Sequence, residues 1–233
     1  YPGSTREFIT PYLKKFSIGK NFFLGYSPER EDPNNIKYKL ENIPKICSGY
    51  SDNCLNITKN LYSNILNKVV GVSNLETAEF VKLYENIYRS VNIGLVNEMK
   101  MISNKLNLNI YEIINAAKTK PFGFQAFYPG PGVGGHCIPV DPYYLSWVAK
   151  KNKIKTNLIY HAGKINSDMP NWILKEILKK KKIKNVLIIG VAYKKDLDDT
   201  REAPSIDFIK ILIQKKIKVD FHDPNVKYLQ SRK

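Results

Sequence analysis

The chain has 233 residues, 43% of them hydrophobic, which suffices for one large or two small domains with a buried core. No apolar run approaches the ~20 residues of a membrane-spanning helix, and the first residues lack the basic and apolar regions of a signal peptide. The three cysteines (Cys47, Cys54 and Cys137) are an odd number without metal-ligand spacing. We therefore expect a cytoplasmic protein without a disulfide framework, a bound metal or a membrane contact.

The net charge of +16 admits two interpretations. A basic protein of this kind can bind nucleic acid or serve as a non-catalytic scaffold. The lysines are, however, spread along the whole sequence, and the one tight run (179–182) ends a helical pattern, where cations suit the helix dipole. We favour a lysine-rich solvated surface whose positive potential attracts an anionic substrate, and we expect no nucleic-acid partner.

Residues 1–74 alternate short apolar runs with helical patterns. We expect strands at 21–26, 45–49 and 68–72, and helices at 6–15 and 51–66. This alternation predicts a parallel sheet at the end of an α/β domain. The charged loop at 27–33 follows the first strand, and ligands of such sheets bind beyond the strand ends.

A single long helix is predicted from about residue 75 to residue 106. Apolar side chains recur there with a 3.6-residue period, and Gly94 is the one glycine. The polar residues Lys82, Asn86 and Arg89 form a separate stripe, which is either a solvated face or a functional one. Further helices are expected at 109–119, 141–150 and 158–182, so residues 75–182 are predicted to be all-helical.

The loop at 127–142, which we call the glycine loop, carries the clearest chemical signal. It combines four glycines and four prolines with Cys137. Asp141 and Pro142 then predict the start of a helix. Near a helix N-terminus and cations a thiol ionises more readily, and the thiolate is the nucleophile.

From residue 183 the pattern changes to a strand at 185–190, a helix from 203 to about 215 and a strand at 218–222. This unit predicts the start of a nucleotide-binding-like domain. No G-x-G-x-x-G fingerprint is present. If a dinucleotide is used, we expect its main binding half ahead of Tyr1.

Several segments together resemble the nucleotide-sugar 6-dehydrogenases, which use NAD to oxidise C6 of a UDP-hexose to a carboxylate. The matching segments cover nearly the whole chain in the family's order: YPGST (1–5), YSPER (26–30), EFVKLYENIYRSVNIGLVNE (79–98), PGPGVGGHCIPVDP (129–142), KIN (164–166), GVAYKKD (190–196) and DTRE (199–202). TKPFGF (119–124) and FYPGPG (127–132) look most like the UDP-N-acetylglucosamine enzymes of surface polysaccharide synthesis. UDP-glucose and UDP-N-acetylmannosamine enzymes carry variants of these loops and remain alternatives.

The resemblance implies an α/β fold in three parts. Residues 1–74 would end an NAD-binding Rossmann domain, and residues 75–182 would form a helical central domain that makes a homodimer or a higher oligomer. Residues 183–233 would begin a UDP-binding Rossmann-like domain. The chain would thus be part of a longer enzyme and inactive by itself.

The resemblance also implies a four-electron oxidation through a covalent intermediate on the thiol. The catalytic residues would be Cys137 as nucleophile, Lys82 and Asn86 as oxyanion stabilisers, Asp141 to orient the water or the lysine, and Glu29 as general base. The substrate would contact Glu29, Arg30, Lys82, Asn86, Tyr128, Pro129, Gly130, Gly132, Gly134 and Lys194, and NAD would contact Cys137 and Arg201. A two-electron alcohol dehydrogenase is a third alternative, against which the presence of Cys137 argues.

Overall fold

The computed structural model describes residues 1–31, 38–135, 137–180 and 182–229. Contacts divide the chain into two compact units. The first unit holds residues 1–86 and 147–154, and the second holds residues 87–146 and 155–233. Helices α2 (Leu75–Lys105) and α4 (Asp141–Lys151) contribute residues to both. The three-part division at residues 74 and 182 stays a prediction.

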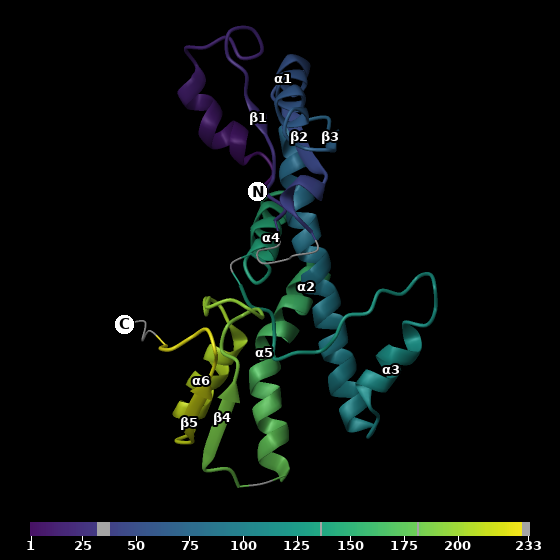
Figure 1. Ribbon diagram of the computed structural model, residues 1–233, viewed down its shortest axis with the longest axis vertical. Helices are drawn as coiled ribbons and strands as arrows, with labels where there is room; N and C mark the ends of the chain where they lie inside the picture. Colours follow the sequence, from purple (N-terminus) through teal and green to yellow (C-terminus); the bar gives the residue numbers. More distant parts are fainter. Residues whose placement is uncertain (32–37, 136, 181, 230–233) are drawn as a thin grey trace. The chain divides into compact units, whose positions relative to one another are not determined.

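The first unit contains a three-stranded sheet in the order β1-β2-β3. Strands β2 (Lys45–Gly49) and β3 (Val69–Gly71) are parallel, as predicted, and α1 (Asp52–Ser63) connects them and packs against both (Figure 1). The helix begins where Ser51 accepts a hydrogen bond from the backbone N–H of Cys54. Cys47 and Cys54 are fully buried in this layer, where free cysteines pack as small hydrophobic residues.

The predicted first strand was too long and the expected all-parallel sheet was wrong. Strand β1 covers only Gly25–Tyr26 and pairs antiparallel with β2. The residues before it form a turn, in which Phe22 stacks on Phe16 with ring centroids 4.9 Å apart. The predicted helix at 6–15 is likewise irregular, with a π-helical turn η1 (Thr5–Ile9) followed by a 3₁₀ turn η2 (Thr10–Leu13). A further 3₁₀ turn, η3, covers Leu40–Asn42.

Helix α2 confirms the predicted long helix to within one residue. Asn74 caps its start, because the Asn74 side chain accepts a hydrogen bond from the backbone N–H of Thr77 at 2.8 Å. At Gly94 a Cβ would stand 3.0 Å from the Cα of Ala162 in α5 (Asn157–Lys180). The glycine therefore permits a close approach of the two helices within the second unit.

Two further helices of the second unit end near their predicted positions. Helix α3 (Ile110–Ala117) begins at its N-cap Asn109 and packs Ile110 and Ile114 against Val96 of α2. Helix α5 continues through Pro170. Proline cannot donate a hydrogen bond to the carbonyl four residues earlier, which here is that of Asn166.

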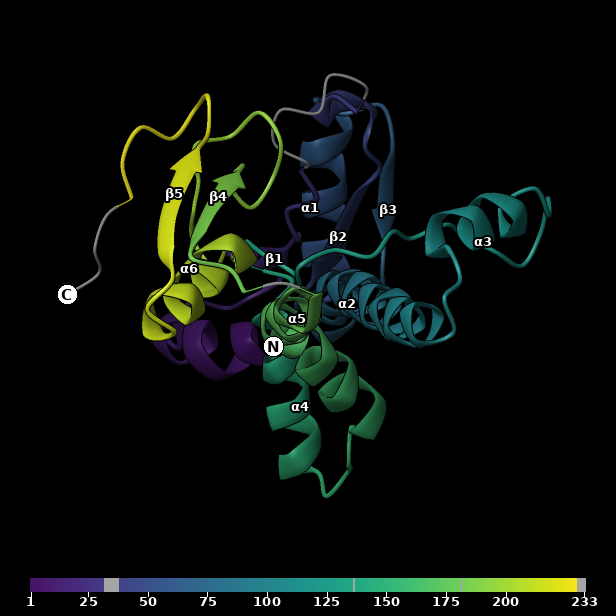
Figure 2. The same cartoon turned by 90° about the horizontal axis from the view of Figure 1, so that it is seen from below.

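The last part of the second unit is a β-α-β arrangement, as predicted. Strands β4 (Asn185–Ile189) and β5 (Lys218–His222) are parallel, with α6 (Pro204–Gln214) between them in sequence (Figure 2). A core of Leu174, Leu212 and Ile217 joins α5, α6 and the sheet. Strand β4 alternates between partly buried and exposed residues, with Leu187 60% and Ile189 79% exposed, because helices pack on one sheet face only among the described residues.

Candidate active site

The charged loop after β1 is tied to its surroundings through Arg30. The Arg30 guanidinium donates to the carbonyl oxygen of Pro44 at 2.7 Å and pairs with Glu85 of α2 at 2.6 Å. Ser27 donates to the carbonyl oxygen of Ile46 at 2.6 Å. Arg30, a predicted substrate contact, therefore ties the charged loop after β1 to the residue before β2 and to α2, all within the first unit.

Glu29, the predicted general base, is held by Lys45 at the start of β2. The Lys45 ammonium group donates to its carboxylate at 3.0 Å, and the backbone N–H of Arg30 donates at 2.8 Å. Partial burial raises the pKa of the Glu29 carboxyl, but these hydrogen bonds lower it more, so its pKa lies below the ordinary value. Glu29 is thus ionised at neutral pH, as a base must be, and is a weaker base than a free glutamate.

The polar stripe at the start of α2 is not a plain solvated face. Asn86 is fully buried and Lys82 is partly buried. Glu79, three residues before Lys82, is also buried and accepts hydrogen bonds from the backbone N–H groups of Gly3 and Thr5 at 2.5 and 2.8 Å. The sequence analysis gave Glu79 no role, although its place on the same helical stripe was a usable signal.

The glycines of the glycine loop serve close packing inside the second unit. A Cβ on Gly132 would stand 2.8 Å from the carbonyl oxygen of Asn166, and one on Gly134 would stand 2.7 Å from Cβ of Tyr193. A Cβ on Gly135 would stand 3.0 Å from the ring of Tyr193. Only at Gly130, among the loop's glycines, is the nearest such atom as far as 3.9 Å. The close packing gives three of these glycines a role in the fold, and the expectation that Gly130, Gly132 and Gly134 contact the substrate stays a prediction.

A relay of buried amides holds the start of the glycine loop. The backbone N–H of Gly130 donates to the Asn97 side-chain oxygen at 3.0 Å, and the Asn97 amide donates to the Asn166 side-chain oxygen at 3.0 Å. The Asn166 amide donates in turn to the carbonyl oxygen of Ser90 at 2.9 Å. Asn97 and Asn166 lie on α2 and α5, and both are buried. The sequence analysis missed this relay, because its members are far apart along the chain.

Cys137 lies exposed immediately before α4. Its backbone carbonyl accepts hydrogen bonds from the N–H groups of Val140 and Asp141, at 3.1 and 2.8 Å. Helix α4 begins at Asp141, which confirms the predicted helix start and puts the predicted water-orienting carboxylate in the first turn. The preceding residue, His136, lies outside the described residues. An accessible thiol at a helix N-terminus is suited to nucleophilic attack.

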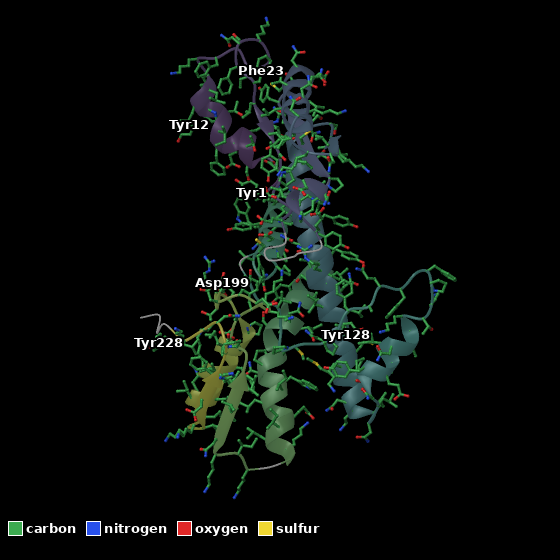
Figure 3. All side chains as sticks on the ribbon, viewed as in Figure 1. Tyr1, Tyr12, Phe23, Tyr128, Asp199 and Tyr228 are labelled. Carbon is green, nitrogen blue, oxygen red and sulfur yellow. The ribbon has the colours of Figure 1, made fainter. Side chains whose placement is uncertain are left out.

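A cavity of about 110 Å³ lies beside the glycine loop in the second unit. Its polar lining includes Ser90, Tyr143, Asn166 and Glu202. The predicted substrate residue Tyr128 is about half exposed and lies beside α2 (Figure 3). The glycine loop is therefore packed on one side and open on another.

The loop between β4 and α6 carries the last two predicted site residues. Lys194 is partly buried there, and the Arg201 guanidinium pairs with Asp199 at 2.6 Å, in the position marked in Figure 3. The hydrogen bond from Arg201 to Asp199 raises the pKa of the guanidinium. Asp223, after β5, accepts from the backbone N–H groups of Val191 at 2.8 Å and of Asn225 at 2.9 Å, which lowers the pKa of its carboxyl. Sequence reasoning did not single out Asp223.

The structure therefore places the predicted residues in two groups. Glu29, Arg30, Lys82 and Asn86 belong to the first unit, whereas the glycine loop, Cys137, Asp141, Lys194 and Arg201 belong to the second. Within residues 1–31, 38–135, 137–180 and 182–229, no group of three His, Cys, Asp or Glu side chains is suited to hold a metal ion. In the same part of the chain, no helix is long and apolar enough to cross a membrane.

Comparison with known proteins gives consistent matches. Residues 76–168 match the central domain of the UDP-glucose/GDP-mannose dehydrogenase family, and residues 187–233 match its UDP binding domain. The UDP-N-acetyl-D-glucosamine 6-dehydrogenase of Pseudomonas aeruginosa is 34% identical over 96% of this chain and 55% of its own length. The UDP-N-acetyl-D-mannosamine dehydrogenase of Methanococcus aeolicus is 35% identical over 97% of this chain and 51% of its own length.

Solved structures agree with these relatives. The UDP-D-ManNAc dehydrogenase of Pyrococcus horikoshii superposes with a TM-score of 0.87 at 34% identity, covering 97% of this chain and 55% of that one. The UDP-N-acetyl-mannosamine dehydrogenase Cap5O of Staphylococcus aureus gives a TM-score of 0.82 at 35% identity, over 97% of this chain and 54% of that one. The chain spans about half the length of the curated relatives it matches. By these matches and the fold they share, the chain belongs to the UDP-glucose/GDP-mannose dehydrogenase family.

Proposed function

We propose that the complete gene product oxidises C6 of a UDP-N-acetylhexosamine to the carboxylate, using NAD and a covalent intermediate on Cys137. The observation that carries the proposal is the exposed Cys137 in the tightly packed glycine loop, shortly before α4 begins, in a chain of this family. UDP-N-acetylglucosamine is the first candidate substrate, because the loop sequences look most like those enzymes. UDP-N-acetylmannosamine is the second, because relatives of both names match at about the same identity.

The thiol determines the sequence of the chemical steps. The substrate alcohol first loses a hydride and a proton and becomes an aldehyde. The Cys137 thiolate then adds to the aldehyde carbon, and loss of a second hydride from this thiohemiacetal gives a thioester. Water attacks the thioester, which releases the carboxylate and returns the thiol. The covalent step keeps the aldehyde on the enzyme.

The other proposed residues act on charge and protons. Lys82 and Asn86 would stabilise the oxyanion that develops at C6. Glu29, which Lys45 keeps ionised, would accept a proton from the attacking water, and Asp141 would orient that water. Removal of one such donor or base typically costs on the order of 10²–10⁴ in rate.

NAD would accept both hydrides when bound. The chain itself contains no G-x-G-x-x-G fingerprint, so its own residues fit only part of such a site. Arg201 would contribute one contact: its pair with Asp199 holds the guanidinium in the β4–α6 loop while its side chain stays 56% exposed. On the substrate side, Lys194 of the same loop would contact the diphosphate or the sugar, and residues 128–134 would hold the UDP-sugar. We also propose that residues 1–74 end a Rossmann domain, that residues 183–233 begin a Rossmann-like one, and that α2 supports a homodimer or a higher oligomer.

The test is to count the NADH formed per sugar by the complete gene product on a panel of UDP-hexoses. Two NADH per sugar, lost in the Cys137→Ala variant, are expected. One NADH per sugar would favour a two-electron alcohol dehydrogenase with the same fold.

A further inference from the structure

We propose that Asn97 and Asn166 are positioning residues that hold the start of the glycine loop in the conformation that binds the UDP-sugar. This inference rests on the proposed function, because that function makes residues 128–134 the substrate-binding segment. Neither asparagine would touch the substrate. Both act through Gly130, whose backbone N–H is fixed by the relay.

The two ends of the relay determine its direction. One end is the backbone carbonyl of Ser90, which can only accept a hydrogen bond, and the other is the backbone N–H of Gly130, which can only donate. Each amide between them must therefore donate toward Ser90 and accept from the side of Gly130. A flip of either amide would set two acceptors or two donors against each other. Only a residue with both an acceptor and a donor at this reach can occupy either position.

Burial makes the hydrogen bonds of the relay costly to lose. Asn97 is fully buried, so water cannot replace a partner lost there without entering the interior. Asn166 is 5% exposed and lines the cavity beside the glycine loop. The helices that carry them approach closely at Gly94 and Ala162, which brings Asn166 within reach of Ser90. The relay therefore fixes the position of the loop relative to α2 and α5, whose spacing is itself fixed.

The relay holds one end of the glycine loop, and packing holds the other. The backbone carbonyl of Asn166 lies 2.8 Å from where a Cβ on Gly132 would stand, so Asn166 packs against the loop with its main chain, while its side chain reaches the loop only through Asn97. Farther along, Gly134 and Gly135 contact Tyr193 in the β4–α6 loop. Because the Cys137 end is held independently, loss of the relay should weaken substrate binding more than it slows the chemical steps.

The first measurement uses the 233-residue chain and needs no activity. Asn97→Leu and Asn166→Leu keep side chains of similar size but remove the relay, and hydrogen exchange of the Gly130 amide reports the result. We expect exchange to become about tenfold faster in either variant, the loss of one net hydrogen bond. The double variant should add little, because the amides act as a unit. Asn92→Leu is the matched control, since Asn92 lies on the same helix and its amide donates to the carbonyl oxygen of Tyr88, one turn earlier, outside the relay.

The second measurement uses the complete gene product. The KM for the UDP-sugar should rise about tenfold in each relay variant, with kcat within about twofold of wild type, while Asn92→Leu leaves both unchanged. Faster exchange without a change in KM, a fall in kcat at constant KM, or unchanged Gly130 exchange would each overturn the inference. If wild type oxidises no UDP-sugar, the proposed function falls and the substrate role with it, whereas the exchange data still decide whether the relay orders the loop. Should one asparagine variant fail to fold, the other tests the same relay.

Discussion

Replacing Gly134 by alanine tests whether the glycine loop is fixed by close packing. The added Cβ would stand 2.7 Å from Cβ of Tyr193, 2.9 Å from Cδ of Pro204 and 3.1 Å from the carbonyl oxygen of Glu202, against 3.4–4 Å for ordinary contacts. These atoms belong to backbone, a proline ring or the base of a side chain, none of which can rotate away. Such overpacking typically costs about 1–3 kcal/mol, offset by about 0.4–1 kcal/mol from the lower entropy of the unfolded alanine chain.

The matched control is Gly130→Ala, for which the nearest atom to the new Cβ lies at 3.9 Å. That variant should be as stable as wild type or slightly more stable. Urea unfolding, followed by circular dichroism, gives the free energy of unfolding from the midpoint and the slope. The entropy gain of the unfolded chain is common to both variants and cancels, so we expect Gly134→Ala to be about 1–3 kcal/mol less stable than Gly130→Ala. Equal stability of the two variants would refute the packing argument.

Two further predictions concern carboxylates. Lys45→Met should raise the pKa of Glu29 toward its ordinary value, because a hydrogen bond and a positive charge are lost, whereas the control Lys45→Arg keeps the charge. NMR titration of the Glu29 side chain measures its pKa in both variants. An unchanged pKa in Lys45→Met would contradict this reasoning. The lowered pKa of Asp223 gives stability that is fully present above the unfolded pKa of about 4 and is lost as pH falls through the lower folded pKa. Unfolding free energies from about pH 5 to pH 2.5 should therefore fall less steeply in Asp223→Asn than in wild type, and parallel profiles would show that this carboxylate contributes nothing to the acid loss.

Local signals predicted the regular elements of this chain well. Asn74 caps α2 and Pro204 opens α6, so both helices begin close to where the sequence indicated. Helix α4 begins at Asp141 for a similar local reason. Caps and proline act over a few residues, and a linear pattern contains all the information that they need.

The errors arose where distant residues decide the local structure. The sheet is not all parallel because β1 pairs antiparallel with β2, which comes much later in the chain. The packing of α5, α6 and the β4–α6 loop against Gly132 and Gly134 was likewise not visible in the linear pattern, because these elements lie far along the chain.

Part of the candidate site could be named from motifs, but its supports could not. Cys137 and Asp141 are adjacent to a recognisable helix start. The relay of Asn97 and Asn166 joins residues 69 positions apart, and no periodicity connects them. Lys45 supports Glu29 from a neighbouring strand in the same way. Supporting residues of this kind become visible only when the elements are placed in space.

In the proposed reaction, Cys137 holds the aldehyde formed by the first oxidation as a covalent intermediate for the second. The most direct measurement incubates the complete gene product with NAD and UDP-N-acetylglucosamine, and counts NADH per sugar in wild type and in Cys137→Ala. The account predicts two NADH per sugar in wild type, and loss of the uronic acid product without the thiol. One NADH per sugar, or an uronic acid yield that does not depend on Cys137, would contradict it.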